Sequence, residues 1–263
     1  VRVEHAGFEI TPENELNGIA FQGVGSGTTV EYIQVHLNAD DGVEFFGGTV
    51  NAKYIVLTGT GDDALDWTQG WTGKVQHVLI KSYADDGDQG IEADNNGDDN
   101  TATPRALPTL ANMTLLGSGN DDVGILLREG TGANIFNSIS TGWGEHCVDI
   151  DNTETFNFAG APGARTGNLT MTNSIVFGCT QGLYSEDAAD PWPVSDWYTE
   201  QAGNITSDPL LGGLTGLEPQ AGSPALVGID VTPPDAFFDT VNYLGGFDPV
   251  DNWAAGWTIG LND

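Results

Sequence analysis

The sequence predicts an all-β solenoid, in which short strands stack coil upon coil. Three observations support this prediction. A short apolar strand recurs along the chain, a second family of strands alternates with the first, and no segment shows a convincing amphipathic helical period. The chain has 263 residues, of which 39% are hydrophobic, so it can bury a sizeable core despite its acidic composition.

The first strand family consists of short apolar runs, most of them preceded by a small residue. Successive small residues are separated by 24, 22, 26, 34, 23 and 35 residues, and the longer intervals contain polar insertions. Regular spacing of this kind indicates one structural unit repeated along the chain. The runs are NGIAF (17–21), DGVEF (41–45), DALDW (63–67), QGIEAD (89–94), VGILLR (123–128), HCVDID (146–151) and QGLYSE (181–186).

The second strand family lies between the runs of the first. Its members are rich in β-branched residues and are bounded by Gly, Asp, Asn and Thr, which is typical of strands. Aligned on one another, they place Ile33, Ile55 and Val78 in one column. The runs are TVEYIQV (29–35), NAKYIVL (51–57), KVQHVLI (74–80), LANMTLL (110–116), ANIFNSI (133–139) and NLTMTNSI (168–175).

The repeat is too short for a propeller blade, and the Leu-x-x-Leu-x-Leu pattern of leucine-rich repeats is absent. The arrangement resembles the right-handed parallel β-helix of the pectate-lyase-like superfamily. This resemblance implies about seven coils within residues 1–203. Because Val1 already lies within a strand-like run, we expect earlier sequence to be missing.

The C-terminal part of the chain carries a second resemblance. Residues 204–228 are similar to the "DP…L…GSPA…G" ending common in bacterial β-helix proteins. Residues 241–258 look like the end of secreted β-helix proteins without assigned activity. We therefore expect residues 204–263 to form an extension or cap of the same domain that packs along the coils.

The charge balance excludes several classes of partner. With 38 acidic against 7 basic side chains, the net charge is −31, which argues against nucleic acid and anionic membrane surfaces as partners. No run of about eighteen apolar residues is present, so no membrane span is expected. The acid excess points to high salt, bound cations, or both. Cys147 and Cys179 are either bridged or packed as small core residues.

Stacking converts the repeat into columns of residues about 4.8 Å apart along the axis. Paired acids precede the strands of the first family and would repel one another, so they serve either tight Asx turns or bound divalent cations. The expected inward column is Val43, Leu65, Ile91, Ile125 and Val148; the next column outward is Glu44, Asp66, Glu92, Leu126 and Asp149; and the turn acids are Asp40–Asp41, Asp62–Asp63, Asp85–Asp86, Asp121–Asp122 and Glu145.

The densest acidic segment, residues 83–100, is the predicted calcium site. It holds seven acids and three Asn with no basic residue, although it is not an EF-hand because the closing Glu is absent. The alternative is a solvated polar insertion between coils. The candidate ligands are Asp85, Asp86, Asp88, Glu92, Asp94, Asn96 and Asp98.

Three insertions, residues 95–109, 152–167 and 187–201, follow strands of the first family and could wall a groove. By its resemblance to polysaccharide lyases on the same fold, Arg128 could act as the base, with a metal held by Asp94 and Asp151. The alternative is that Arg128 only offsets the neighbouring carboxylates. A hydrolase with paired carboxylates is a further option. In the third insertion, Trp192, Trp197 and Tyr198 could stack on sugar rings.

These expectations lead to one functional prediction and two alternatives. We expect an extracellular or cell-surface protein, bacterial and adapted to saline conditions, that is stabilised by Ca²⁺. It would have a structural or adhesive role, or bind a glycan or an extracellular matrix component. The first alternative is a calcium-dependent lyase that acts on an acidic polysaccharide. The second is an assembly module that stacks through the missing N-terminal sequence or through exposed coil ends.

Overall fold

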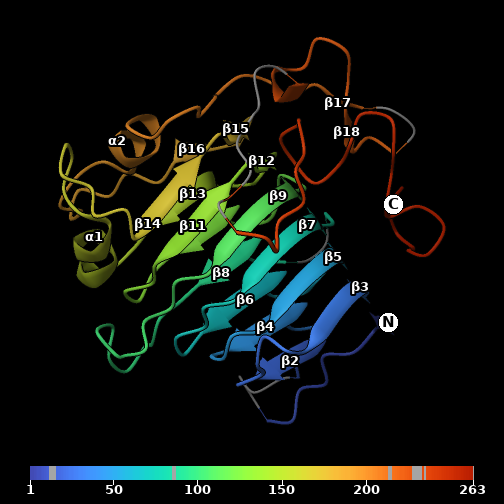
Figure 1. Cartoon of the computed structure of the whole chain (residues 1–263), viewed down its shortest axis with the longest axis horizontal. Coiled ribbons are helices and arrows are strands. Elements are labelled where there is room, and N and C mark those ends of the chain that lie inside the picture. Colours follow the sequence, from blue (N-terminus) through green and yellow to red (C-terminus); the bar gives the residue numbers. More distant parts are fainter. Residues whose placement is uncertain (12–15, 85–86, 213–214, 227–232, 234, 263) are drawn as a thin grey trace.

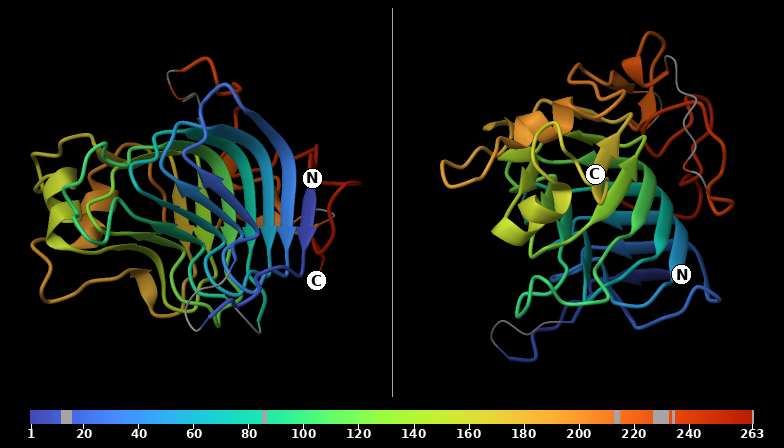
Figure 2. Two further views of the ribbon diagram at one scale, coloured as in Figure 1. Left: turned by 90° about the horizontal axis from the view of Figure 1, so that it is seen from below. Right: turned by 60° about the vertical axis from the view of Figure 1, so that its left-hand side comes forward.

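A computed structural model describes residues 1–11, 16–84, 87–212, 215–226, 233 and 235–262. Its strands stack along one axis, from the N-terminal coils in blue to later coils in yellow (Figure 1). Successive coils contribute a short strand to one sheet and a longer or divided strand to another (Figure 2). Both stacks are parallel throughout, so the chain is a parallel β-helix, as predicted.

The first predicted family forms a seven-stranded parallel sheet within the described residues. Neighbouring strands in this sheet come from successive coils, which confirms a stack of about seven coils. Its strands are β2 (Ile19–Gln22), β4 (Val43–Phe46), β6 (Leu65–Thr68), β8 (Ile91–Ala93), β10 (Ile125–Leu127), β13 (His146–Ile150) and β16 (Gly182–Tyr184).

The second family forms the larger, nine-stranded sheet. Ile33, Ile55 and Val78 stand in register across three neighbouring strands, as the alignment predicted. The strands are β1 (Arg2–Glu4), β3 (Thr29–His36), β5 (Asn51–Thr58), β7 (Lys74–Lys81), β9 (Thr109–Leu116), β11 (Ala133–Phe136), β12 (Ile139–Thr141), β14 (Leu169–Thr172) and β15 (Ile175–Phe177).

A column of residues with positive φ bends this larger sheet. The left-handed region is costly for residues other than glycine, and Asn tolerates it best. The column separates β11 from β12 at Asn137 and β14 from β15 at Asn173. In the longer strands it lies inside the strand. Its members are Tyr32, Tyr54, His77, Asn112, Asn137 and Asn173, with φ between 48° and 62°.

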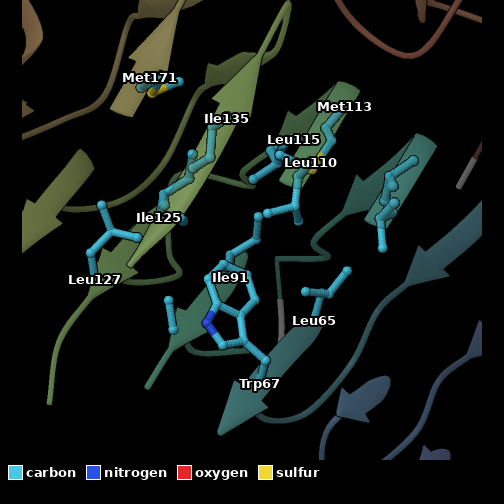
Figure 3. Close-up of a cluster of buried hydrophobic side chains, with 14 of the residues drawn as sticks. Leu65, Trp67, Ile91, Leu110, Met113, Leu115, Ile125, Leu127, Ile135 and Met171 are labelled. Atoms are coloured by element: carbon cyan, nitrogen blue, oxygen red, sulfur yellow. The ribbon is translucent and has the colours of Figure 1, made fainter. Parts of the chain in front are cut away.

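The predicted inward column forms the centre of the core. Val43, Leu65 and Ile91 pair in register across β4, β6 and β8, and all three are fully buried. Ile125 and Val148 continue the column and are also fully buried. Figure 3 shows Leu65, Ile91 and Ile125 packed with side chains from the opposite sheet, so the two sheets enclose one continuous core.

Two short helices lie in the insertions, although the sequence showed no helical period. α1 (Thr153–Ala159) and α2 (Val194–Thr199) span only seven and six residues, which is too short to establish such a period. Both lie at the yellow-to-orange end of the stack (Figure 1) and bury Phe156 and Trp197, respectively, in the core. Among the described helices, none has the length and apolar character needed to cross a bilayer.

The C-terminal segment returns along the larger sheet toward the first coil, as the predicted extension would. Backbone atoms of Tyr243 and Gly245 accept hydrogen bonds from Asn112, and the Gln34 side chain is bonded to Ile259. The predicted boundary between residues 203 and 204 stays a prediction. The segment contains β17 (Leu211–Gly212), β18 (Glu218–Pro219) and a 3-10 turn (Pro224–Leu226).

Cys147 and Cys179 form a disulfide with an S–S distance of 1.98 Å. Cys147 lies in β13 and is fully buried, and Cys179 packs against the same core. The bridge therefore joins two successive coils near the C-terminal end of the stack, which settles the choice left open by the sequence.

Candidate metal centre

Carboxylates line the outward side of the seven-stranded sheet in the predicted column. Glu44 of β4 pairs in register with Asp66 of β6, and Asp66 pairs with Glu92 of β8. Leu126 and Asp149 continue the column in β10 and β13. Parallel pairing places such neighbours about 4.8 Å apart, so the alignment brings three acids side by side.

One acid in each of three turn pairs performs a backbone role. Oδ1 of Asp41 accepts the N–H of Asp63 at 3.2 Å, and Oδ1 of Asp63 accepts the N–H of Gln89 at 2.8 Å. Asp121 repeats the arrangement with Gly144 at 2.9 Å. Each carboxylate thus holds the turn of the next coil, which explains why acids recur in this turn.

Asp41, Glu44 and Asp66 form a close group of three buried carboxylates. Their ligand oxygens lie within 4.8 Å of one another, and each residue is less than one-tenth exposed. Nδ2 of Asn17 donates to Asp41 Oδ2 at 3.0 Å and to Glu44 Oε2 at 2.6 Å. Asp66 Oδ1 is buried with no hydrogen-bond partner. An orphaned carboxylate oxygen is costly in this environment and is what a bound cation would satisfy.

Burial and mutual repulsion disfavour the charged form of this group. Burial, followed by the charge of Glu44, raises the pKa of Asp41 to about 8. Burial is also the main cause that raises the pKa of Glu44 and Asp66. The three side chains must therefore share protons or bind a cation, and a set made only of carboxylate oxygens suits hard ions such as Ca²⁺ and Mg²⁺.

A second group shares Asp41 with the first. Asp40, Asp41 and Asp62 also bring their oxygens within 4.8 Å of one another, but Asp40 and Asp62 are more accessible to solvent than Glu44 and Asp66. Exposed carboxylates are solvated by water and need no ion. Within the part of the chain that the structure describes, the buried group around Asp66 is therefore the stronger candidate.

Comparison with models of protein families matches residues 1–258 to the pectate-lyase-like β-helix domain. The chain belongs to this family. No curated protein and no solved structure matches it. Membership of the pectate-lyase-like β-helix family agrees with the stacked parallel sheets and covers both the coils and most of the C-terminal segment.

The calcium site predicted for this β-helix in residues 83–100 divides into three parts. Asp85 and Asp86 lie outside the described residues. Asp88 and Asp98 are exposed, and Asn96 Oδ1 accepts the N–H groups of Asp98 and Asp99 at 3.0 and 2.9 Å. The loop after Asp94 is thus an Asx-type turn, which is the solvated alternative.

Glu92 and Asp94 belong to a separate ion-pair cluster with Arg128. Arg128 Nε donates to Asp94 Oδ1 at 3.0 Å, and its Nη2 donates to Glu92. Burial raises the pKa of Glu92 to about 7, with Arg128 opposing the shift. Within the described part of the chain, the ion pairs of Arg128 are with these two residues and do not include Asp151.

The ion pairs make Arg128 a poor general base. Its neighbouring carboxylates raise the pKa of Arg128 above its ordinary value, although burial acts in the opposite direction. A general base must be unprotonated before it can accept a proton, and the neighbouring carboxylates stabilise the protonated form of Arg128. The geometry therefore favours the alternative in which Arg128 offsets buried acids.

The prediction that the three aromatic residues of the third insertion stack on sugar rings is wrong, because all three are buried. Trp197 and Tyr198 are buried in the core, and Trp192 is 8% exposed. Trp197 Nε1 donates to Leu169 O at 3.0 Å, and Tyr198 Oη donates to Ser174 O at 2.7 Å. No ring face of Trp197 or Tyr198 is open to a sugar, because the insertion folds back as α2 and uses them to close the core.

Asn17 is the residue of the candidate centre that sequence reasoning missed. It stands beside the first run of the first family, one coil before Asp41 and Glu44. The signal that could have found it is the alignment itself, because Asn17 precedes Gly18 as Asp41 precedes Gly42. An amide at this position donates to the two acids, where a carboxylate would have added repulsion.

Proposed function

We propose that this chain is an extracellular or cell-surface β-helix protein stabilised by Ca²⁺ bound at Asp41, Glu44 and Asp66. Its role would be structural or adhesive, or the binding of a glycan. The observation that carries the proposal is the buried, partnerless Oδ1 of Asp66 within a group of three carboxylates. A divalent cation offsets their repulsion and satisfies that oxygen at once.

The donor set favours calcium over other divalent ions. The group contains oxygen ligands only, whereas zinc and copper sites rely on His or Cys. Ca²⁺ accepts six to eight oxygens in flexible geometry, while Mg²⁺ demands a near-ideal octahedron. The three carboxylates lie on two strands and one turn, and water molecules would complete the coordination shell of the ion. Such an irregular set of ligands suits Ca²⁺ better than Mg²⁺.

The disulfide supports an extracellular location. Bridges such as Cys147–Cys179 persist in oxidising compartments and are rare in the cytosol. Extracellular fluid also supplies calcium at the concentrations that weak, partly hydrated sites need. The lyase alternative has less support, because Arg128 is neutralised by Glu92 and Asp94.

The proposal is tested by thermal unfolding of the protein with chelator and with millimolar CaCl₂. Calcium should raise the melting temperature of the native protein by mass action on the folded state. Asp66→Asn should lose most of this increase, because it removes a charged ligand and keeps the side-chain size. Asp98→Asn, in the loop predicted from the sequence, should keep all of it.

Two results would contradict the proposal. One is a melting temperature that does not respond to calcium in the native protein. The other is a calcium response that survives Asp66→Asn and disappears in Asp98→Asn, which would return the site to the loop of residues 94–100. Incubation with pectate and alginate, followed by ultraviolet detection of unsaturated products, tests the lyase alternative in parallel.

A further inference from the structure

A cavity of about 420 Å³ lies where the C-terminal segment crosses the larger sheet. Tyr54 of β5 and His77 of β7 form its sheet side, and residues of the segment between Asp239 and Trp253 form the other side. The cavity is thus on the nine-stranded sheet, whereas the candidate metal centre is on the seven-stranded sheet. Ligand pockets commonly have volumes of this size.

The sheet side of the cavity presents ring edges and a hydroxyl group. One face of Tyr54 stacks on Tyr32 at 4.5 Å and the other on His77 at 4.9 Å. Both faces of Tyr54 are therefore occupied, and Trp253 already stacks on Phe247 at 5.2 Å. A ligand here would meet polar atoms and ring edges, and would not lie flat on Tyr54.

The cavity is electronegative. Asp239, Asp248 and Asp251 line it, and no Lys or Arg occurs among its described lining residues. Lys53 Nζ lies 2.8 Å from Asp239 Oδ2 and offsets one of the three charges. Burial lowers the pKa of His77 to about 4, so its ring adds no positive charge at neutral pH. A cationic ligand is attracted here, and an anionic sugar is repelled.

Tyr243 supplies an unpartnered polar group. The residue is 6% exposed and lines the cavity, and its hydroxyl has no hydrogen-bond partner among the described residues. Burial and the charge of Asp248 raise its pKa, with Asp239 and Asp251 adding to the shift. Tyr243 lines the same cavity as Asp239, Asp248 and Asp251. The hydroxyl oxygen is not one of the buried polar atoms that lack a partner, so it is open to the cavity, where a ligand can replace the water that solvates it.

The spacing of the carboxylates excludes a single metal ion shared by all three. The groups of described residues that bring three ligand atoms within 4.8 Å lie around Asp41, and Asp239, Asp248 and Asp251 do not form such a group. A ligand that contacts all three of these acids must therefore be larger than a single ion.

We propose that this cavity binds a polyhydroxylated ligand that carries a protonated amine, which is the chemistry of an amino sugar. The ammonium group would lie between Asp248 and Asp251. The hydroxyls of the sugar would bond to Tyr243, Thr240 and Asn242, which line the cavity. This binding needs no calcium and does not depend on the proposed metal centre.

Calorimetric titration of the whole protein in chelator tests the proposal. The probes are a glucosamine tetramer and its N-acetylated counterpart, which keeps the rings and removes the charge. The glucosamine tetramer should bind at least about tenfold more tightly, because a charge-assisted hydrogen bond is lost on acetylation. Asp251→Asn and Tyr243→Phe should each weaken its binding by about fivefold to tenfold.

Matched controls separate this site from general electrostatic attraction. Asp187→Asn changes an exposed carboxylate outside the cavity and should leave the affinity unchanged. Equal binding of the two tetramers would overturn the proposal. So would an affinity that is insensitive to both Asp251→Asn and Tyr243→Phe, or a tetralysine peptide that binds as tightly as the amino sugar.

Discussion

Glu44 and Asp66 occupy directly opposed positions on neighbouring parallel strands, and both carboxylates are buried. Like charges opposite one another destabilise a sheet, and burial strengthens their repulsion. The pair is therefore stable only with a shared proton or a bound cation. This choice determines how stability responds to substitution, pH and calcium.

Replacing Glu44 by Gln should have opposite effects with and without calcium. In chelator, the variant should gain about 1 kcal/mol in the free energy of unfolding, because one of two opposed buried charges is removed. With millimolar calcium it should be less stable than the native protein, because a ligand is lost. Urea unfolding in the two buffers measures both effects. Glu9→Gln, at an exposed position, should change neither, and a loss of stability in both buffers would contradict the electrostatic explanation.

The stability of the calcium-free protein should fall as the pH rises from about 6.5 to about 8. In the folded state the pKa of Asp41 is raised from 3.8 to about 8, so the folded protein binds a proton that the unfolded chain has already released. Glu92, with its pKa raised to about 7, acts in the same direction. His77 acts in the opposite direction, but only below its ordinary pKa of 6.5, because its folded pKa is lowered to about 4.

Urea midpoints between pH 5 and 9 in chelator measure this dependence. Calcium should flatten or reverse the slope, because metal binding requires deprotonated carboxylates. Stability that increases between pH 6.5 and 8 without calcium would contradict the assigned pKa shifts.

Removing Arg128 should destabilise the protein at neutral and alkaline pH. Arg128→Gln leaves Glu92 and Asp94 without their counter-charge, and the expected loss is about 1–3 kcal/mol because the guanidinium is partly exposed. The loss should shrink at pH 5, where burial favours protonation of these acids. Adding Asp94→Asn should restore part of the stability, and a double variant less stable than Arg128→Gln alone would argue against this role.

Breaking the disulfide should lower stability by about 3–4 kcal/mol. The bridge closes a loop with a sequence separation of 32 residues, and its absence releases chain entropy in the unfolded state. The Cys147→Ala/Cys179→Ala double variant measures this effect by urea unfolding. Reductant should lower the melting temperature of the native protein and leave that of the variant unchanged.

Asn112 combines a positive φ of 54° with hydrogen bonds to the carbonyls of Tyr243 and Gly245. Asn112→Ala removes the hydrogen bonds and also places a residue that tolerates positive φ poorly at this position. Asn112→Gly removes only the hydrogen bonds, because glycine adopts positive φ readily. We expect alanine to destabilise the protein by about 2–4 kcal/mol and glycine by about 1–2 kcal/mol less than alanine. Thermal unfolding of the two variants gives the comparison, and equal losses would show that the backbone conformation contributes nothing.

The stack itself could be predicted from the sequence, because a parallel register repeats the same environment in every coil. Val43, Leu65 and Ile91 followed from this repetition, as did the acid column that begins at Glu44. The acidic composition indicated bound cations, and we predicted them in the densest acidic segment, residues 83–100. In that segment Asn96 accepts two backbone N–H groups, Asp99 accepts another from Thr101, and Asp98 is exposed to water. Asp66 is buried, and its Oδ1 has no such partner.

The features that could not be predicted depend on contacts outside the repeat. Trp197 and Tyr198 fall in an insertion, where nothing in the sequence distinguishes a ring that closes the core from one that faces solvent. The cavity next to Tyr54 depends on the path of a segment almost two hundred residues further along the chain. Such contacts have no periodicity to reveal them.

The returning C-terminal segment couples the unfolding of the first coil to that of the later coils. Coils that touch only their neighbours can peel away one at a time from either end. Here Arg2 donates a hydrogen bond to Trp257 O, Gln34 is bonded to Ile259, and Gly245 is bonded to Asn137. The first coil cannot detach without disturbing a segment that also holds the later ones. We therefore expect the coils to unfold in a single cooperative transition and to resist proteolysis from the ends of the stack.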